Sequence, residues 1–253
     1  MSERRARHAR SPGSARSQHF LRSQAVAAEL VRDADVGSAD LVLDLGAGSG
    51  RLTAELARAG ARVVAVELDP HWAGRLRGRW ANVEVVLGDA ASLALPREPF
   101  RVVANLPFAR TNAILRHLLD DPRVPLVRAD LIVEWGVAMK RALPWPSTFN
   151  DVVWGAWYSA AVTRRLARGA FEPAPSVDAG VLVFSRRACP LVPAGLAEPY
   201  RRFVAAGFRR RTDARDLDAY AWAELFRRGG ARAASGARHG RGARRPRPRR
   251  ASS

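Results

Sequence analysis

The sequence predicts an α/β fold of the Rossmann-like type, in which helices cover a mostly parallel sheet. Apolar runs of strand length alternate with amphipathic helical segments between residues 41 and 119. A shorter, arginine-containing helical segment follows at residues 188–226. We therefore expect one α/β domain over residues 18–187 and a small C-terminal helical domain over residues 188–226.

The charge of the chain favours a polyanionic partner. The sequence has 42 Lys+Arg against 24 Asp+Glu, a formal net charge of +18, and Lys140 is its only lysine. Arginine binds phosphate through two parallel hydrogen bonds and stacks on bases, which favours a nucleic-acid partner. A GC-rich genome would explain the preference for arginine over lysine, but not the excess of positive charge.

Both ends of the chain are basic and contain few apolar residues. Residues 1–17 are rich in arginine, serine, glycine and alanine, and residues 227–253 in arginine, glycine, alanine and proline. Such segments bury too little apolar surface to fold. We predict a disordered basic N-terminal tail at 1–17 and a disordered Arg-rich tail at 227–253.

Several protein classes are disfavoured. Cys189 is the only cysteine, and the five histidines form no HExxH pattern, so we assign no disulfide and no metal ligands. No apolar run approaches the roughly 20 residues that span a bilayer, and no signal-peptide segment follows the basic N-terminus. We expect a soluble, cytoplasmic protein without a membrane partner.

The α/β domain begins with Gln18-His19-Phe20-Leu21, directly before a predicted helix at Ser23–Val31. By itself this quartet is more typical of a docking anchor than of a ligand site. The strand Leu41–Leu45 then runs into the loop Gly46–Gly50, and a helix is predicted at Arg51–Ala59. This order is typical of nucleotide binding, because glycine lets a ligand approach the backbone at a helix N-terminus.

The next three predicted strands also end in residues with ligand chemistry. They are followed in turn by Glu67, which lies 21 positions after Gly46, by Gly88-Asp89 and by Asn105. An acid about 20 positions after a glycine loop is suited to ribose hydroxyls. Parallel strands end at one edge of the sheet, so these residues should meet there. A dinucleotide dehydrogenase would use only the glycine loop and Glu67, whereas S-adenosyl-L-methionine has adenine, ribose and amino-acid groups for all of them.

The tetrapeptide Asn105-Leu106-Pro107-Phe108 follows the fourth strand. Asn105 offers an amide donor and a carbonyl acceptor. Pro107 disfavours helix at Leu106, so the Leu106 carbonyl can face a cleft, and Phe108 supplies a flat apolar face. Two acceptors and a ring suit an amino group on a planar base. Without other context, an ordinary strand-to-helix turn with a buried Phe108 is the simpler interpretation.

The middle of the chain combines basic residues with aromatic ones. A helix is predicted at 112–119, a strand at 130–135, a basic and proline-broken loop at 139–146, and a closing strand at 177–185. The tryptophans of this region are Trp145, Trp154 and Trp157, and each is either a base-stacking or a core residue. A core position is least favoured for Trp145. Three arginines form a candidate phosphate-contacting edge, namely Arg164, Arg165 and Arg168.

In their order, these motifs resemble the ribosomal RNA adenine N6-methyltransferase family, specifically the erythromycin-resistance (Erm) type that modifies large-subunit rRNA. The resemblance covers roughly residues 17–187. Two positions depart from the family pattern, because the family usually has Asn where this chain has His19 and often Tyr where it has Phe108. His19 can still donate a hydrogen bond, and Phe108 keeps the ring. The motifs are Gln18-His19-Phe20-Leu21, Asp44-Leu45-Gly46-Ala47-Gly48-Ser49-Gly50, Glu67-Leu68-Asp69, Gly88-Asp89-Ala90, Asn105-Leu106-Pro107-Phe108 and Phe171-Glu172-Pro173-Ala174-Pro175-Ser176-Val177-Asp178.

The resemblance implies a class I methyltransferase sheet with an antiparallel last strand, and S-adenosyl-L-methionine as cofactor. It implies methyl transfer to the exocyclic N6 of a specific adenine in 23S rRNA, with macrolide-type antibiotic resistance as the consequence. The expected partner is 23S rRNA before full ribosome assembly, bound by a monomer. The implied catalytic residues are Asn105, Leu106 and Phe108, and the implied cofactor-binding residues are His19, Leu21, Gly46, Gly48, Glu67, Asp89 and Asn105.

Alternatives remain open at this point. A small-subunit rRNA adenine dimethyltransferase would share every motif, and a DNA adenine methyltransferase lies further off. A non-catalytic RNA-binding member of the same fold is the alternative from another class, although the intact Gly46, Glu67, Asp89 and Asn105 argue against it.

Overall fold

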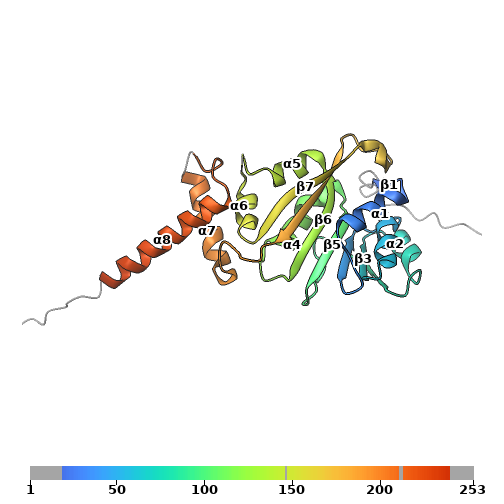
Figure 1. The fold of residues 1–253 in the computed structure, drawn as a ribbon, viewed down its shortest axis with the longest axis horizontal. Coiled ribbons are helices and arrows are strands. Elements are labelled where there is room, and N and C mark those ends of the chain that lie inside the picture. The colour runs from blue at the N-terminus through green and yellow to red at the C-terminus, as the bar shows by residue number, and fades with distance from the viewer. Residues whose placement is uncertain (1–18, 146, 211–212, 240–253) are drawn as a thin grey trace, which may run out of the picture.

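A seven-stranded sheet forms the centre of the computed structural model, which describes residues 19–145, 147–210 and 213–239 (Figure 1). The predicted tails at 1–17 and from 240 onward lie outside the described residues. The strands of the sheet are β2 (Leu41–Leu45), β3 (Arg62–Glu67), β4 (Val83–Leu87), β5 (Phe100–Asn105), β6 (Leu126–Glu134), β7 (Tyr158–Leu166) and β9 (Ala179–Arg186).

The strand order is β4-β3-β2-β5-β6-β9-β7. Neighbouring strands from β4 to β6 are parallel, whereas β9 is antiparallel to both β6 and β7. The predicted α/β fold and its antiparallel closing strand are therefore confirmed. From β2 the chain proceeds to β3 on one side and later returns through β5 on the other. Such a reversal of strand order creates a crevice at the carboxyl ends of the strands, where ligands bind in open α/β sheets.

Helices cover both faces of the sheet. They are α1 (Gln24–Asp33), α2 (Arg51–Arg58), α3 (Pro70–Leu76), α4 (Thr111–Leu119), α5 (Trp135–Ala142), α6 (Phe149–Gly155), α7 (Ala197–Arg210) and α8 (Ala219–His239). In β2, Leu41, Leu43 and Leu45 pack in one cluster with α4 and α6, while Val42 packs in the other with α1 and α2. This alternation is the period of two that a strand imposes.

A separate two-stranded ladder closes the N-terminal side. It pairs β1 (Phe20–Leu21) with β8 (Phe171–Glu172), so the residues before the first helix meet a segment about 150 positions later in the chain. Three short 3-10 turns complete the described elements, and they are η1 (Phe108–Arg110), η2 (Arg168–Ala170) and η3 (Ala194–Leu196).

The region between β6 and α6 differs from the sequence prediction. The strand predicted at 130–135 is β6, which begins already at Leu126 and ends at Glu134. It accommodates charge there because Arg128 and Asp130 form an ion pair of 2.7 Å. The loop predicted at 139–146 is wrong for 139–142, because α5 continues to Ala142. Residues 143–145 lie outside helix and strand, as predicted.

The tryptophans divide into two groups. Trp154 and Trp157 are only 2% and 1% exposed, so they are core residues. Trp145 is 56% exposed.

The candidate phosphate edge is partly neutralised, because Arg164 forms ion pairs with Glu29 and Asp33.

The C-terminal helices pack on the α/β domain. Tyr200 of α7 and Trp222 of α8 are buried in the same hydrophobic cluster as the sheet, and the Tyr200 ring meets that of Trp157 edge-on at 5.9 Å. Helix α8 runs to His239, so the disorder predicted from residue 227 is wrong for 227–239. Alanine and arginine have high helix propensity, which explains this extension. Figure 1 shows α8 extending away from the sheet, opposite to α1 and α2.

Candidate functional site

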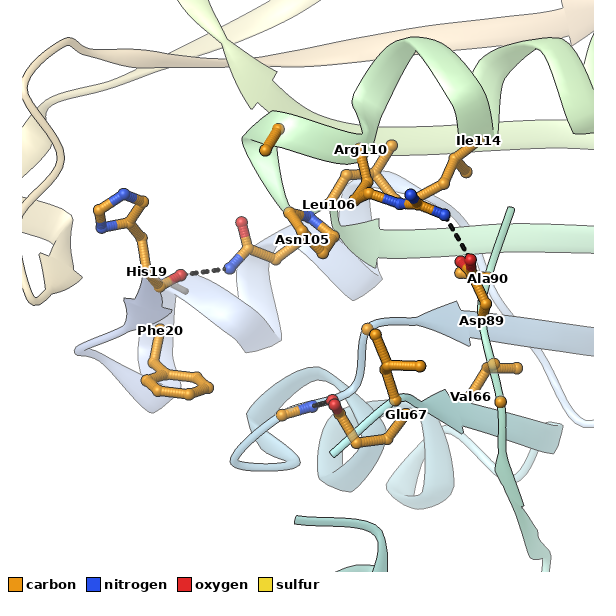
Figure 2. A pocket seen from close by; sticks show the side chains of 16 residues that line it. His19, Phe20, Val66, Glu67, Asp89, Ala90, Asn105, Leu106, Arg110 and Ile114 are labelled. Carbon is orange, nitrogen blue, oxygen red and sulfur yellow. Dashed lines mark hydrogen bonds and ion pairs between the residues drawn. The ribbon is translucent and has the colours of Figure 1, made fainter. Parts of the chain in front are cut away.

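A cavity of about 330 Å³ lies at the carboxyl ends of β2, β3, β4 and β5 (Figure 2). This is the crevice that the strand order predicts, and its size is typical of a small-molecule site. Seven of the nine predicted site residues line it together, although they come from five separate stretches of the chain: His19, Gly46, Gly48, Glu67, Asp89, Asn105 and Leu106.

The glycine loop brings its backbone close to neighbouring side chains. Gly46 has φ +80°, and a Cβ on it would lie 3.2 Å from Cδ of Pro107. Gly48 has φ +52°, and a Cβ on it would lie 2.6 Å from the Phe20 ring. Both positions require glycine, because a side chain would be strained by the backbone and would collide with its surroundings.

Glu67 is a buried acceptor at the end of β3. Its side chain accepts hydrogen bonds from the backbone N–H groups of Gly48, at 2.7 Å, and Asp69, at 2.8 Å. The residue is 3% exposed and lines the cavity. Each carboxylate oxygen can accept a further hydrogen bond, so Glu67 can still bind a hydroxyl donor.

A second buried acid, Asp44, lies behind the glycine loop. Its carboxylate accepts a 2.6 Å hydrogen bond from the Thr53 hydroxyl. Burial raises the pKa of Asp44 from 3.8 to about 7, the Thr53 hydrogen bond opposes this, and the negative charge of Glu67 adds to it. Asp44 therefore holds a proton over much of the acidic range, which limits the negative charge beneath the loop.

Asp89 and Arg110 form an ion pair across the cavity lining (Figure 2). A 2.9 Å hydrogen bond from the Ala91 N–H and the Arg110 guanidinium lower the pKa of Asp89 below its usual range. The carboxyl is thus ionised at neutral pH and is a strong acceptor for an amino group. Arg110 itself was not predicted, because its contact joins residues 21 positions apart.

Asn105 carries an acceptor that has no partner among the described residues. Its Nδ2 donates a 2.6 Å hydrogen bond to the His19 carbonyl, which fixes the orientation of the amide (Figure 2). Its Oδ1 is buried and makes no hydrogen bond within the described structure. A buried acceptor without a partner is costly, so this oxygen is suited to receive a donor from a ligand.

Leu106 and Phe108 lie on either side of that amide. The Leu106 side chain is buried at 2% exposure, while its N–H donates to the Ile132 carbonyl at 3.1 Å. Phe108 does not line the cavity; its ring lies 5.4 Å from the His19 ring and packs partly against the core on the α1 face. Any ring stacking by Phe108 must therefore occur beside His19, at the rim.

Two residues of the N-terminal quartet differ from the prediction. Leu21 is buried in β1 and does not line the cavity. Phe20 does line it and meets the Trp72 ring at 5.1 Å. The predicted quartet contained Phe20, and the alternation of β1 was the available signal: if Leu21 faces the core, Phe20 faces the other side.

The motif at 171–178 supports the N-terminal side of the site. Nδ1 of His19 donates to the Pro173 carbonyl at 2.8 Å, and β8 pairs with β1. Asp178 accepts hydrogen bonds from Arg165 at 2.7 Å, and its carbonyl accepts from the Trp135 N–H. The motif therefore joins the quartet to the ends of β6 and β7.

The donor and acceptor pattern fits a nucleoside-type ligand with an amino-acid portion. The buried Glu67 and the ionised Asp89 are available for hydroxyl and amino donors. The glycine loop lines the cavity with its backbone, although the N–H groups of Gly46 and Gly48 already donate within the chain. Within the described ranges, no cluster of three His, Cys, Asp or Glu residues could hold a metal ion. No described helix has the length and apolarity needed to cross a bilayer.

Comparison with known proteins agrees with this geometry. A sequence model of the ribosomal RNA adenine dimethylase family matches residues 14–217. The chain is 36% identical over 201 residues to an rRNA methyltransferase of Streptomyces thermotolerans. The match covers 76% of this chain and 64% of that relative, so the chain spans slightly less than two thirds of the relative's length. It is also 36% identical over 207 residues to the ribosomal RNA small subunit methyltransferase A of Kineococcus radiotolerans, covering 77% and 68% of the two chains.

A solved structure gives the same result. The crystal structure of the 23S rRNA methyltransferase ErmE superposes with a TM-score of 0.70 and 25% identity, over 83% of this chain and 98% of that one. Because the family model matches residues 14–217, which include the α/β domain and α7, the chain belongs to the ribosomal RNA adenine dimethylase family.

Proposed function

We propose that this protein transfers a methyl group from S-adenosyl-L-methionine to the exocyclic N6 of one adenine in ribosomal RNA. The observation that carries the proposal is the buried Oδ1 of Asn105, which has no partner in the described structure while its Nδ2 is held by the His19 carbonyl. The fixed amide presents an acceptor, and not a donor, at the edge of the cavity. An amino group on a planar base is the donor that this arrangement suits.

The cavity residues fit the cofactor. Glu67 would accept hydrogen bonds from the ribose hydroxyls, Asp89 from the adenine amino group, and the backbone at Gly46 would approach the carboxylate. His19 would border the methionine end. When bound, S-adenosyl-L-methionine supplies a methyl group that is already activated on a sulfonium.

The residues of the turn would act on the target base. The lone pair of an adenine amino nitrogen is delocalised into the ring, so the nitrogen is a poor nucleophile. Hydrogen bonds from its two hydrogens to Oδ1 of Asn105 and to the Leu106 carbonyl would favour a pyramidal nitrogen with a localised lone pair. Phe108 would stack on a base turned out of its helix. Positioning supplies most of the catalysis, and the released proton can go to water.

We infer 23S rRNA, before full ribosome assembly, as the substrate, with macrolide-type resistance as the consequence and a monomer as the active form. The likeness to a 23S rRNA methyltransferase and the motif pattern support this choice. A second candidate is methylation of 16S rRNA, which the likeness to a small-subunit methyltransferase favours. Both candidates use the same cavity and the same turn.

A labelled-methyl transfer assay on naked 23S rRNA, 16S rRNA and DNA separates these candidates. Incorporation into 23S rRNA alone is expected, and mass spectrometry of the labelled fragment then gives the nucleotide and the number of methyl groups. Incorporation into 16S rRNA alone would select the second candidate. Absence of transfer to all three, together with absence of cofactor binding, would refute the enzyme proposal.

Substitution of Asn105 by alanine tests the role of its acceptor. Removal of one aligned catalytic hydrogen bond typically costs about a hundredfold in kcat, so Asn105→Ala should lose at least that much. The thermal unfolding temperature should change little, and the loss in kcat should exceed any loss of cofactor affinity, because Asn105 also lines the cofactor cavity. Asn150→Ala, an amide on α6 outside the cavity lining, is the matched control. Retained activity in Asn105→Ala would show that the acceptor geometry is wrong.

A further inference from the structure

A second cavity, of about 140 Å³, lies between α5, α6 and the start of α8 and shares no lining residue with the first. Aromatic side chains from four elements line it, namely Trp154, Tyr158, Phe184 and Tyr220. An aromatic lining is suited to a flat ligand, because planar rings stack on one another.

A buried donor without a partner also lines this second cavity. The Arg141 side chain is 9% exposed, and its Nη atoms are occupied by Asp151 at 2.7 Å and Thr148 at 3.0 Å, among others. Its Nε is buried and makes no hydrogen bond within the described structure. A buried N–H of this kind is suited to a ligand with an acceptor nitrogen or oxygen.

Two of the most exposed aromatic side chains belong to this region: Tyr220 lines the second cavity, and Trp145 directly follows Pro144, which lines it. Trp145 is 56% exposed, yet its indole N–H donates a 2.9 Å hydrogen bond to the Asp216 carbonyl. Tyr220 is 55% exposed, and the Arg187 guanidinium lies 4.7 Å from its ring centroid and donates to its hydroxyl at 2.6 Å. Both rings are thus held in place, which lowers the entropy lost when a base stacks on them. The Arg187 guanidinium lies over the Tyr220 ring, so a base would stack on the rest of its exposed surface.

The charges around the second cavity favour a nucleotide. Asp151 is paired with Arg141, and Asp218 accepts from the Ala221 N–H at the start of α8. Arg215 is exposed, and its carbonyl accepts a 2.9 Å hydrogen bond from the N–H of Ser147, which lines this cavity. A phosphate can therefore meet a cation here, and a base can meet an aromatic face.

The second cavity is also connected to the proposed target turn. Nη2 of Arg141 donates to Oδ1 of Asn112 at 3.1 Å. Asn112 is the second residue of α4, which begins directly after the η1 turn that carries Phe108. An RNA strand whose target adenine lies at Asn105 would thus reach the second cavity by following the start of α4.

We propose that this second cavity, with Tyr220 in its lining and Trp145 next to its lining residue Pro144, binds an unpaired base of the substrate RNA that flanks the target adenine. The base would stack on the exposed rings and accept a hydrogen bond from Nε of Arg141. This inference rests on the proposed function for its RNA substrate. It adds a specificity site, because a nucleotide beside the target is then held at a second position.

The test uses the full chain and a hairpin RNA from the methylated rRNA region, with 2-aminopurine placed in turn at each unpaired position. In the wild type, one flanking position should lose fluorescence on binding, because stacking quenches this base. Trp145→Ala and Tyr220→Ala should abolish that quenching and weaken RNA binding by about tenfold each, the lower range for one stacked base. The KM for RNA should rise in parallel, with kcat and cofactor affinity unchanged.

Two variants serve as controls. Trp145→Phe keeps an aromatic face and should retain most of the quenching. Leu196→Ala removes an exposed apolar side chain outside the cavity lining and should behave as wild type.

The inference is overturned if the double variant of Trp145 and Tyr220 binds the hairpin and quenches the probe as the wild type does. It is equally overturned if RNA affinity falls while every quenching position is retained, because the rings would then act only structurally. If the double variant binds the hairpin normally but no longer binds ribosomal particles, the surface would instead contact a ribosomal protein. The quenching signal needs no turnover, so a chain that binds RNA at this site without methylating it would refute the proposed function alone.

Discussion

The raised pKa of Asp44 makes the stability of the fold depend on pH in an unusual direction. Most native carboxyls have lowered pKa values and lose stability in acid. Asp44 is fully buried, and its pKa is raised from 3.8 to about 7 by that burial and by the neighbouring Glu67. The folded state therefore binds more protons than the unfolded chain between these two values. The stability that this carboxyl contributes is complete below about pH 4 and is lost as the pH rises through about 7.

The size of this effect follows from the two pKa values. Between about pH 5 and about pH 8 the free energy of unfolding should fall by roughly 3 kcal/mol through Asp44 alone. Asp44→Asn removes the titration but keeps an oxygen that can accept from the Thr53 hydroxyl. The variant should therefore gain roughly 3 kcal/mol relative to the wild type over the same range.

Urea unfolding without cofactor, followed by tryptophan fluorescence at several pH values, measures this difference. Other titrating groups cancel when the variant is compared with the wild type at each pH. Asp121→Asn is the control, because hydrogen bonds from Arg123 hold the pKa of Asp121 below its usual value and its protonation does not change in this range. A difference between Asp44→Asn and wild type that stays constant with pH would show that Asp44 is ionised throughout.

Three further predictions concern packing and cofactor binding. Asp89→Ala removes an ionised acceptor, so calorimetry should find S-adenosyl-L-methionine bound about tenfold more weakly or worse, and an unchanged Kd would remove Asp89 from the cofactor site. Gly48→Ala should lower the free energy of unfolding by about 2 kcal/mol, because Gly48 has a left-handed φ and a Cβ there would contact the Phe20 ring. Phe20→Ala in the same chain should recover the steric part of this loss. Additive losses in the double variant would rule out that contact. Trp157→Ala should cost about 3–5 kcal/mol in denaturant unfolding, whereas Trp145→Ala should cost little, and equal costs would contradict the burial difference between them.

The parallel strands and the residues at their ends followed from the sequence, because local patterns determine both, whereas the order of the strands in the sheet came from the structure. Each parallel strand is an apolar run, and its last residue lies at the same sheet edge as the others. Glu67 and Asn105 could be placed in this way without any knowledge of tertiary contacts. The start of β6 could not, since the prediction began the strand at Asp130 and left out Arg128, whose charge Asp130 neutralises.

Residues whose role depends on distant partners were missed or misjudged. Arg110 lines the cavity only because Asp89 lies opposite it. Arg141 looked like part of a basic loop, yet it is buried beside Asp151, ten positions further on. The sequence disfavoured a core position for Trp145 but left that of Trp154 open, and the burial of Trp154 comes from the packing of α6 beneath the C-terminal helices.

The segment from Asn105 to Arg110 serves both halves of the proposed reaction. Asn105 and Leu106 would face the target amine, while Arg110, at the end of the η1 turn, pairs with the acid proposed for the cofactor adenine. Phe108 is the first residue of the same turn. A cofactor that donates a hydrogen bond to Asp89 would compete with Arg110, and Arg110 and Phe108 share one short turn. We therefore expect cofactor binding and placement of the target base to be coupled, so that substitution of Arg110 should change the RNA affinity of the cofactor-bound form more than that of the free protein.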